Sequence, residues 1–217
     1  MSIKELKERE KEQRREYIVD AAEKLFFSKG YDSVSMNEIA EAVGMNKATL
    51  YLYFKNKEAL YFAIVARGLR IMNRLFTEKI AQETTGIDQI RATGVAFLEF
   101  NSQYHHYYRM LNYAGSERFD TSDIEDADEA FRLSSEVFAA MGKAVATGIA
   151  DGTIRKGLDP LAVAIYLSTA ASAVVNLNVS LINAMESRGV NYRQFIDDAM
   201  ELMIYSISTQ PQTKRSD

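Results

Sequence analysis

Apolar residues recur along the first part of this chain at the spacing that places them on one face of an α-helix. Between Ile18 and Phe26 they stand three or four residues apart, which predicts a helix that packs against a core. Lys29 and Gly30 then supply a cation for the last turn and a glycine for a left-handed cap, so we expect the helix to end there. Residues 1–16 instead carry opposite charges three and four residues apart, which is typical of an exposed helical extension.

The next pattern predicts two short helices joined by a tight turn. Ser35 and Glu38 have the spacing of a capping box, in which each residue bonds the backbone of the other at the start of a helix. Gly44 follows soon afterwards and tolerates the positive φ that a turn requires. Asn46 can then cap a second helix over about residues 47–54.

Helical periodicity continues through the rest of the chain. Asn56 can cap a long helix that runs through Leu75, and Asp159 followed by Pro160 is a strong signal for a helix start. The remaining helices that we expect cover residues 87–110, 123–150, 160–187 and 192–208. No run of residues alternates with the period of a β-strand, and no internal repeat is visible. The fold class is therefore predicted to be all-α.

Composition narrows the function classes without changing this picture. The 217 residues include two prolines, which suits long helices, and no cysteine, which excludes disulfides, thiolate catalysis and cysteine-bound zinc. The net charge of −4 divides into +3 over residues 1–74 and −7 over the remainder, so a polyanion would bind near the N-terminus. No secretory signal and no membrane span are visible, and we expect a soluble cytoplasmic protein.

Two short helices joined by a tight turn are the means by which a helix-turn-helix presents its second helix to the DNA major groove. Ala40 is small enough for the two helices to cross closely, and Ile39 and Leu50 are apolar residues that can lock the pair. Polar and aromatic residues, including Lys47 and Tyr51, lie near the start of the second helix. The pattern predicts a DNA-reading unit.

Residues 14–60 resemble the DNA-binding domain of the tetracycline-repressor (TetR) family. The resemblance is carried above all by the stretch GYDSVSMNEIAEAVGMNKATLYLYFKNKEAL. The positions that match the family motif are Gly30-Tyr31, Ile39-Ala40, Gly44, Thr49-Leu50-Tyr51, Tyr53-Phe54 and Lys57-Glu58-Ala59-Leu60. Leu52 departs from the polar residue that is common at its position, but it can contact a thymine methyl group.

The resemblance implies an N-terminal three-helix DNA-binding domain at residues 1–58, a C-terminal helical domain for effector binding and dimerisation at 59–210, and a tail at 211–217. Leu50 and Phe54 are expected in the core. Ser35, Thr49, Tyr53 and Lys55 are expected at phosphate, and Lys47, Ala48, Tyr51 and Leu52 in the groove. The complete set expected at the DNA, with the cap included, is Ser35, Asn46, Lys47, Ala48, Thr49, Tyr51, Leu52, Tyr53 and Lys55.

The resemblance further implies a homodimer that binds an inverted-repeat operator and is released by a small apolar or aromatic effector. Small residues in the helix from Pro160 would let another helix approach closely, as a dimer bundle requires. Aromatic and methionine side chains in the middle of the chain predict either a closed core or an effector pocket. The residues of this candidate pocket are Phe97, Phe100, Tyr104, Tyr107, Tyr108, Phe138, Met141 and Asn176.

Three other interpretations remain open at the level of the sequence. One is an all-helical enzyme or small-molecule carrier with a helix-turn-helix-like N-terminus, although no nucleophile–base pair or phosphate loop is visible, and we expect no enzyme. Another is an activator, and the third is a ligand-independent regulator. We expect no metal site and no cofactor, because the adjacent His105 and His106 cannot converge on one ion and the acidic run at 116–129 lacks the spacing of a calcium loop.

Overall fold

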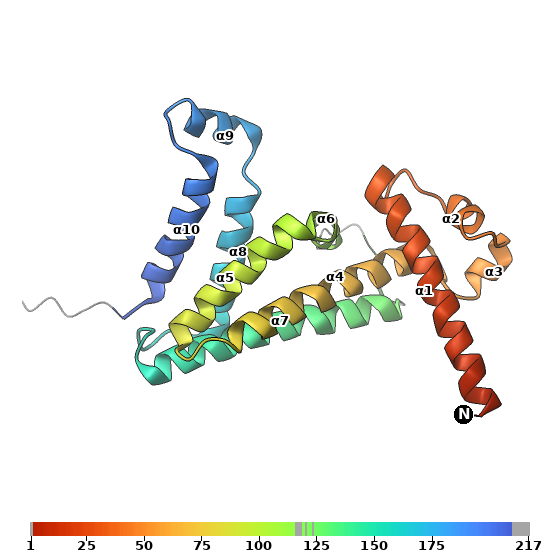
Figure 1. Ribbon diagram of the computed structural model, residues 1–217, viewed down its shortest axis with the longest axis horizontal. Helices are drawn as coiled ribbons and strands as arrows, with labels where there is room; N and C mark the ends of the chain where they lie inside the picture. The colour runs from red at the N-terminus through yellow and green to blue at the C-terminus, as the bar shows by residue number, and fades with distance from the viewer. Residues whose placement is uncertain (1, 116–118, 120, 123, 210–217) are drawn as a thin grey trace, which may run out of the picture. The chain divides into compact units, whose positions relative to one another are not determined.

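The protein is all-α in a computed structural model (Figure 1) that describes residues 2–115, 119, 121, 122 and 124–209. Within these residues there is no β-strand, and a lone bridge joins Ile154 to Ser208. The described helices are α1 Ile3–Lys29, α2 Met36–Ala42, α3 Lys47–Tyr51, α4 Lys57–Ile80, α5 Gly86–Gln103, α6 His105–Ala114, α7 Glu125–Asp151, α8 Pro160–Val175, α9 Val179–Glu186 and α10 Tyr192–Ile207. The predicted fold class is confirmed.

In the N-terminal part the predicted helix end at Lys29 and the predicted cap at Asn56 are confirmed, whereas the cap at Ser2 was not predicted. Ser2 and Glu5 cap α1, which runs without a break through the charged extension to Lys29. Gly30 has a positive φ of 80° but a ψ of 157°, so the chain leaves the helix extended instead of in the left-handed helical conformation. The Asn56 side chain accepts a hydrogen bond from the amide of Ala59 at the start of α4.

Two helices that the sequence pattern predicts to be continuous are broken. The predicted helix 87–110 is divided into α5 and α6 at Tyr104, whose φ of −121° and ψ of 37° are not helical. The predicted helix 160–187 is divided into α8 and α9, which are bent by 73°. The physical reason for the second break is local, because Asn178 accepts a hydrogen bond from the Leu181 amide and so starts a new helix.

The chain forms two compact units, and neither is continuous in sequence. The first unit contains residues 1–71 and 101–134, so it joins α1–α3 and the first half of α4 with α6 and the start of α7. Its core contains Ile18, Ile39, Leu50, Leu60 and Ile64, each fully buried. The second unit contains residues 72–100 and 135–217, and within it α8 packs against α10.

An aromatic cluster lies in the core of the first unit. The rings of Tyr31 and Tyr61 meet edge-on at 4.9 Å between centroids, and Tyr113 and Phe119 pack against both. The Tyr113 hydroxyl donates a hydrogen bond of 3.0 Å to Asp32. The segment that leads into α2 is therefore packed directly against α6 and Phe119.

Among the described residues, no single helix has the length and apolar character needed to cross a membrane. The bent pair of α8 and α9 reaches that length only when the two helices are taken together.

Candidate nucleic-acid interface

Helix α2 begins at a complete capping box. The Ser35 hydroxyl accepts a hydrogen bond from the Glu38 amide at 3.2 Å, and the Glu38 carboxylate accepts one from the Ser35 amide at 2.9 Å. Lys29 also donates to Glu38 at 3.0 Å. These bonds, of which the Ser35 amide bond contributes most, hold the pKa of Glu38 below its ordinary value. The carboxylate is thereby stabilised as an anion at the helix N-terminus, where the helix dipole also favours it.

The turn between α2 and α3 is a Schellman motif. The Met45 amide donates to the Ala40 carbonyl at 2.9 Å, and the Gly44 amide donates to Glu41 at 3.1 Å. Gly44 has a φ of 66°, which a residue with a side chain adopts only at a cost. The glycine that the sequence placed in this turn is therefore required by the backbone conformation.

Helix α3 is short, with five residues, and it is capped at its N-terminus by Asn46. The Asn46 side chain accepts hydrogen bonds from the Thr49 amide at 2.8 Å and from the Thr49 hydroxyl at 3.0 Å. The helix ends at Tyr51, three residues earlier than the sequence pattern predicts, and the amides of Tyr53 and Phe54 continue to donate to the Leu50 carbonyl. Leu50 and Phe54 are buried, as predicted.

The opposite side of this segment is open to solvent. Leu52 is 79% exposed and Tyr51 is 42% exposed, which is unusual for an adjacent pair of large apolar side chains. The Lys47 ammonium lies 5.8 Å from the centre of the Tyr51 ring, a cation–π distance. Lys47, Ala48 and Lys55 are exposed as well. A cationic and apolar surface therefore faces outward from a segment whose other side is fixed in the core.

The other residues expected at the DNA lie around this surface with their side chains partly engaged. The Ser35 hydroxyl is held by Glu38, and the Asn46 carbonyl oxygen is held by Thr49, so their free bonding capacity is limited. Tyr53 is partly buried against the core cluster, and Thr49 is half-buried. All nine residues belong to the first unit and lie within residues 35–55.

Sequence reasoning missed the residues that hold the segment before α2. The Lys57 ammonium donates hydrogen bonds of 2.9 Å to the carbonyls of both Tyr31 and Val34, and it lies 4.0 Å from the centre of the Tyr31 ring. The Tyr31 hydroxyl donates to Glu58 at 2.7 Å. Burial, together with that carboxylate, raises the pKa of Tyr31. Lys57 and Glu58 thus hold the segment before α2, although the residues that they bond lie 23 or more positions earlier in the chain.

The residues of the candidate effector pocket are distributed over both units. Phe97, Phe100, Phe138 and Met141 belong to the second unit, with Phe100 and Met141 buried. The three tyrosines belong to the first unit, where the Tyr107 hydroxyl donates to Glu23 of α1 at 2.7 Å. Asn176 is exposed and ends α8, with its side chain donating to the Ser172 carbonyl. Tyr107 and Asn176 therefore both have structural roles that the sequence did not reveal.

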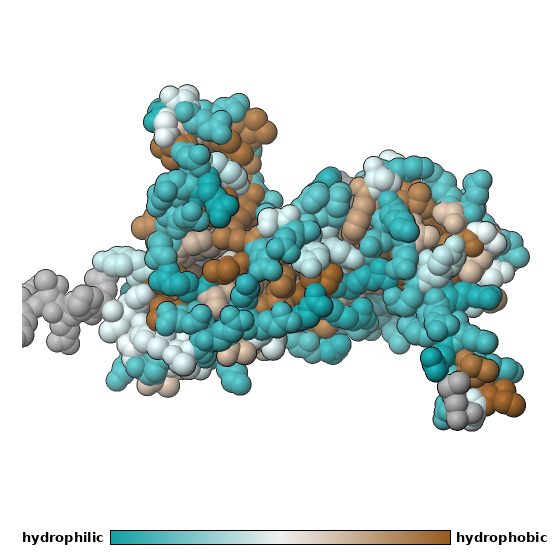
Figure 2. All heavy atoms as spheres, in the orientation of Figure 1, coloured by the Kyte–Doolittle hydropathy of each residue, from teal (hydrophilic) through white to brown (hydrophobic). Residues whose placement is uncertain are grey.

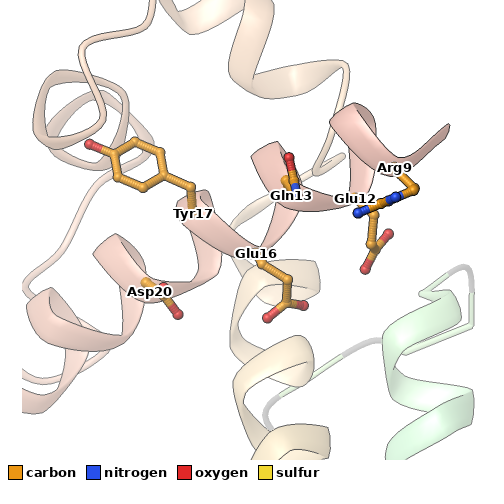
Figure 3. A pocket seen from close by; sticks show the side chains of 6 residues that line it. All are labelled: Arg9, Glu12, Gln13, Glu16, Tyr17 and Asp20. Carbon is orange, nitrogen blue, oxygen red and sulfur yellow. The ribbon is translucent and has the colours of Figure 1, made fainter. Parts of the chain in front are cut away.

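Two of the hollows in the described part of the first unit are lined by residues other than those of the candidate pocket. One, of about 420 Å³, is lined by Arg9, Glu12, Gln13, Glu16, Tyr17 and Asp20 (Figure 3). All six side chains come from α1, so this hollow is a groove along one helix. The other, of about 590 Å³, is lined mainly by charged side chains of α1, α4 and the start of α7.

Comparison with known proteins agrees with this geometry. Residues 18–64 match the family model described as bacterial regulatory proteins, tetR family. A TetR/AcrR-family transcriptional regulator from Thermobifida fusca is 25% identical, with a TM-score of 0.66 over 88% of this chain and 97% of that one. Residues 18–64 therefore form a TetR-family DNA-binding domain. An HTH-type transcriptional regulator of Mycobacterium tuberculosis is 50% identical over 64 residues, which are 30% of this chain and 32% of the relative.

The structure of AibR in complex with isovaleryl coenzyme A and operator DNA has the same fold. It is 19% identical, with a TM-score of 0.64 over 87% of this chain and 97% of AibR. The alignment with the mycobacterial relative spans about a third of that protein. The TetR-family motif is therefore strongest in the helix-turn-helix, and the structure explains two of its pairs: Gly30-Tyr31 and Lys57-Glu58 meet in space and fix the entry to α2.

Proposed function

We propose that this TetR-family protein is a ligand-responsive transcriptional regulator, and that it acts as a homodimeric repressor of an inverted-repeat operator. The observation that carries the proposal is the exposed Lys47–Tyr51–Leu52 surface on a helix-turn-helix whose other side is buried. In a helix-turn-helix such a surface reads base edges in the major groove. Because bacterial DNA lies in the cytoplasm, we place the protein there.

Selection of bound sequences from random duplex DNA tests the DNA-binding part of the proposal. We expect an inverted repeat, since a two-fold dimer presents two copies of one reading surface, with half-site centres about one helical turn or a multiple apart. The matched control is the Tyr51→Ala, Leu52→Ala double variant, whose fold can be compared by circular dichroism. A selection that returns no sequence preference, or the same preference from the control, would count against the proposal.

The dimer is supported by the outward faces of two helices that pack together in the second unit. Leu161, Ile165 and Tyr166 of α8 are exposed, and so are Leu202 and Tyr205 of α10. Figure 2 shows apolar residues gathered at the end of this unit near α9 and along the helices beside it. Monomeric proteins rarely expose so many large apolar side chains on neighbouring helices. A second copy that adds its own α8 and α10 would complete a four-helix bundle.

For the effector we propose a small apolar or aromatic molecule that binds in the second unit near Phe97, Phe138 and Met141. Phe97 and Phe138 are partly exposed and Met141 is buried, so they offer both an accessible ring face and an adaptable thioether. AibR binds isovaleryl coenzyme A, whose branched acyl group is an apolar ligand of this kind. AibR is 19% identical to this chain, so its ligand supports an apolar class of effector and no particular compound.

Phe138→Ala tests the effector proposal more cleanly than a change at Tyr107, because Tyr107 bonds Glu23 of the DNA-binding unit. A small-molecule library is screened for compounds that lower operator affinity of the wild-type protein. We expect Phe138→Ala to weaken the effect of an active compound while ligand-free operator affinity stays within a few-fold. By linkage, operator DNA must weaken compound binding by the same factor, typically worth about 1–3 kcal/mol.

An activator remains the second candidate, since the same reading surface serves either role. Transcription from a reporter that carries the selected operator separates the two, because loss of the gene raises expression for a repressor and lowers it for an activator. An all-helical carrier or enzyme, the other interpretation of the sequence, would show neither response.

A further inference from the structure

Arg15 touches two elements that are far apart in the sequence. The carbon at the centre of its guanidinium lies 4.7 Å from the centre of the Phe54 ring, which is a cation–π distance. The same guanidinium donates a hydrogen bond to the carboxylate of Asp126, in the first turn of α7. Arg15 also forms an ion pair with Glu16, at a longer 3.9 Å.

Phe54 is the point at which this contact reaches the DNA-reading surface. Its ring is 1% exposed, and its amide donates to the Leu50 carbonyl, so it is joined to the last turn of α3. We therefore expect the position of the Phe54 ring to affect the backbone that carries Tyr51 and Leu52. The cation above that ring is held by a residue that lies 72 positions further along the chain.

Asp126 is suited to hold the guanidinium firmly. Its side chain is only 16% exposed, and that of Arg15 is 27% exposed, so the pair is more strongly coupled than a surface ion pair. Burial raises the pKa of Asp126, while Arg15 opposes this by stabilising the anion. The pair borders the charged hollow lined by Glu12, Arg15, Glu16, Arg70, Glu125, Asp126, Asp128, Glu129 and Arg132.

We propose that Arg15 is a positioning residue for the DNA-reading surface, and that Asp126 at the start of α7 holds its guanidinium against Phe54. The start of α7 thereby helps to set the orientation of α3. A separate cluster anchors the rest of α1 to α4, because Arg67 bonds Glu16, Asp20 and Glu23. The Arg15–Asp126 pair is distinct from that cluster, since it connects the start of α7 to Phe54, which follows α3. The proposal rests on the proposed DNA binding.

The test compares Asp126→Asn with Asp128→Asn, which removes the same charge from an exposed residue of the same helix turn. Loss of an acid near the DNA-binding surface should by itself strengthen binding to a polyanion. We instead expect Asp126→Asn to weaken binding to the selected operator, by about three- to tenfold. Asp128→Asn should leave affinity unchanged or raise it. The changes in operator affinity that the two substitutions cause are thus predicted to differ, with a loss for Asp126→Asn and no loss for Asp128→Asn.

Arg15→Met supplies the second arm, because it keeps an unbranched side chain over the Phe54 ring but removes the charge. We expect it to weaken operator binding as much as Asp126→Asn, and the double variant to be no weaker than either. The NMR resonances of the Phe54 ring should shift in both single variants and should not shift in Asp128→Asn.

Equal operator affinities for Asp126→Asn and Asp128→Asn would overturn the proposal, and so would unshifted Phe54 resonances. If the wild-type protein selects no DNA sequence, the proposed function fails instead. The Phe54 resonances would still decide then whether Asp126 positions Arg15.

Discussion

Tyr51 and Lys55 lie four residues apart on the reading surface, and we expect them to contribute to DNA binding in different ways. Tyr51→Ala should weaken binding to the preferred site by about 1–3 kcal/mol and to random DNA much less, since a groove contact distinguishes bases. Lys55→Ala should lower affinity evenly across sequences and reduce the salt slope by about one unit, since a phosphate contact releases counterions. Titration of each variant with the preferred site and with random DNA, at several salt concentrations, measures both affinities and the salt slope. Equal losses for Tyr51→Ala would contradict its role.

Lys57 is expected to matter for stability instead of DNA contact. Lys57→Met removes two charged hydrogen bonds to the carbonyls of Tyr31 and Val34, and each carbonyl then needs another partner. We expect a loss of about 1–3 kcal/mol in the free energy of unfolding, measured by urea denaturation. Lys24→Met, at an exposed position of α1, is the matched control and should change it little. A Lys57 variant as stable as the control would show that solvent satisfies both carbonyls.

Local signals explain which residue roles could be predicted from the sequence. The caps at Ser35, Asn46 and Asp159 were predicted correctly because each bonds an amide three residues away. The role of Lys57 could not be predicted, because its partners lie 23 and 26 residues earlier and only the folded chain brings them together. Arg15 and Tyr107 were missed for the same reason, since Asp126 and Glu23 are 111 and 84 residues distant.

Helices α5 and α7 approach so closely in the second unit that Gly86 admits no side chain. A Cβ atom at Gly86 would lie 1.9 Å from the backbone nitrogen of Gly148. Gly86→Ala should therefore force the helices apart and cost about 2–4 kcal/mol in the free energy of unfolding. Gly94→Ala in the same helix is the control, because its nearest neighbour would be Met200 at 3.9 Å. Calorimetry should show that Gly94→Ala leaves the free energy of unfolding unchanged or raises it by up to about 1 kcal/mol.

Asp151 links the end of α7 to the start of α5 and should make stability depend on pH. Hydrogen bonds from Thr153 and from the Gly86 amide hold the pKa of Asp151 below its ordinary value. Its stabilising contribution is therefore fully present above the pKa of an aspartate in the unfolded chain, which is about 4. The contribution is lost as the pH falls through the lower pKa of the folded state. The difference in unfolding free energy between the wild type and Asp151→Asn should close below that pH. A constant difference down to the acid limit would refute the assignment.

At the scale of elements, the sequence predicted which segments are helical better than it predicted where one helix ends and the next begins. The start of α8 and the span of α10 followed from caps and periodicity, and both are confirmed. The breaks at Tyr104 and between α8 and α9 were not predicted, because an apolar period continues across each of them. Tyr104 has no side-chain cap that could mark the break. Asn178 does carry a local signal for the second break, because asparagine is a preferred residue at a helix N-cap.

Assembly is the property of the whole molecule that most affects DNA binding. Leu202→Glu places a charge on the exposed face of α10 that we assign to the dimer, so we expect a monomer by sedimentation at micromolar concentration. Operator affinity should then fall by at least about tenfold, because the second half-site is no longer engaged by a linked partner. Val95→Glu is the control, since Val95 is also exposed in the second unit but lies on α5. A dimeric Leu202 variant would refute the assigned face.

The division of the first unit between residues 1–71 and 101–134 has a consequence for protein engineering. Regulators of this kind invite chimaeras, in which the reading head of one protein is fused to the sensor of another at the end of the motif, near residue 64. Here that junction would leave behind Tyr113, Phe119 and Asp126, on which the head packs. A chimaera that keeps the native structure of the DNA-binding unit must therefore include both of its segments, residues 1–71 and 101–134. The residues that join these two segments would then come from the other protein.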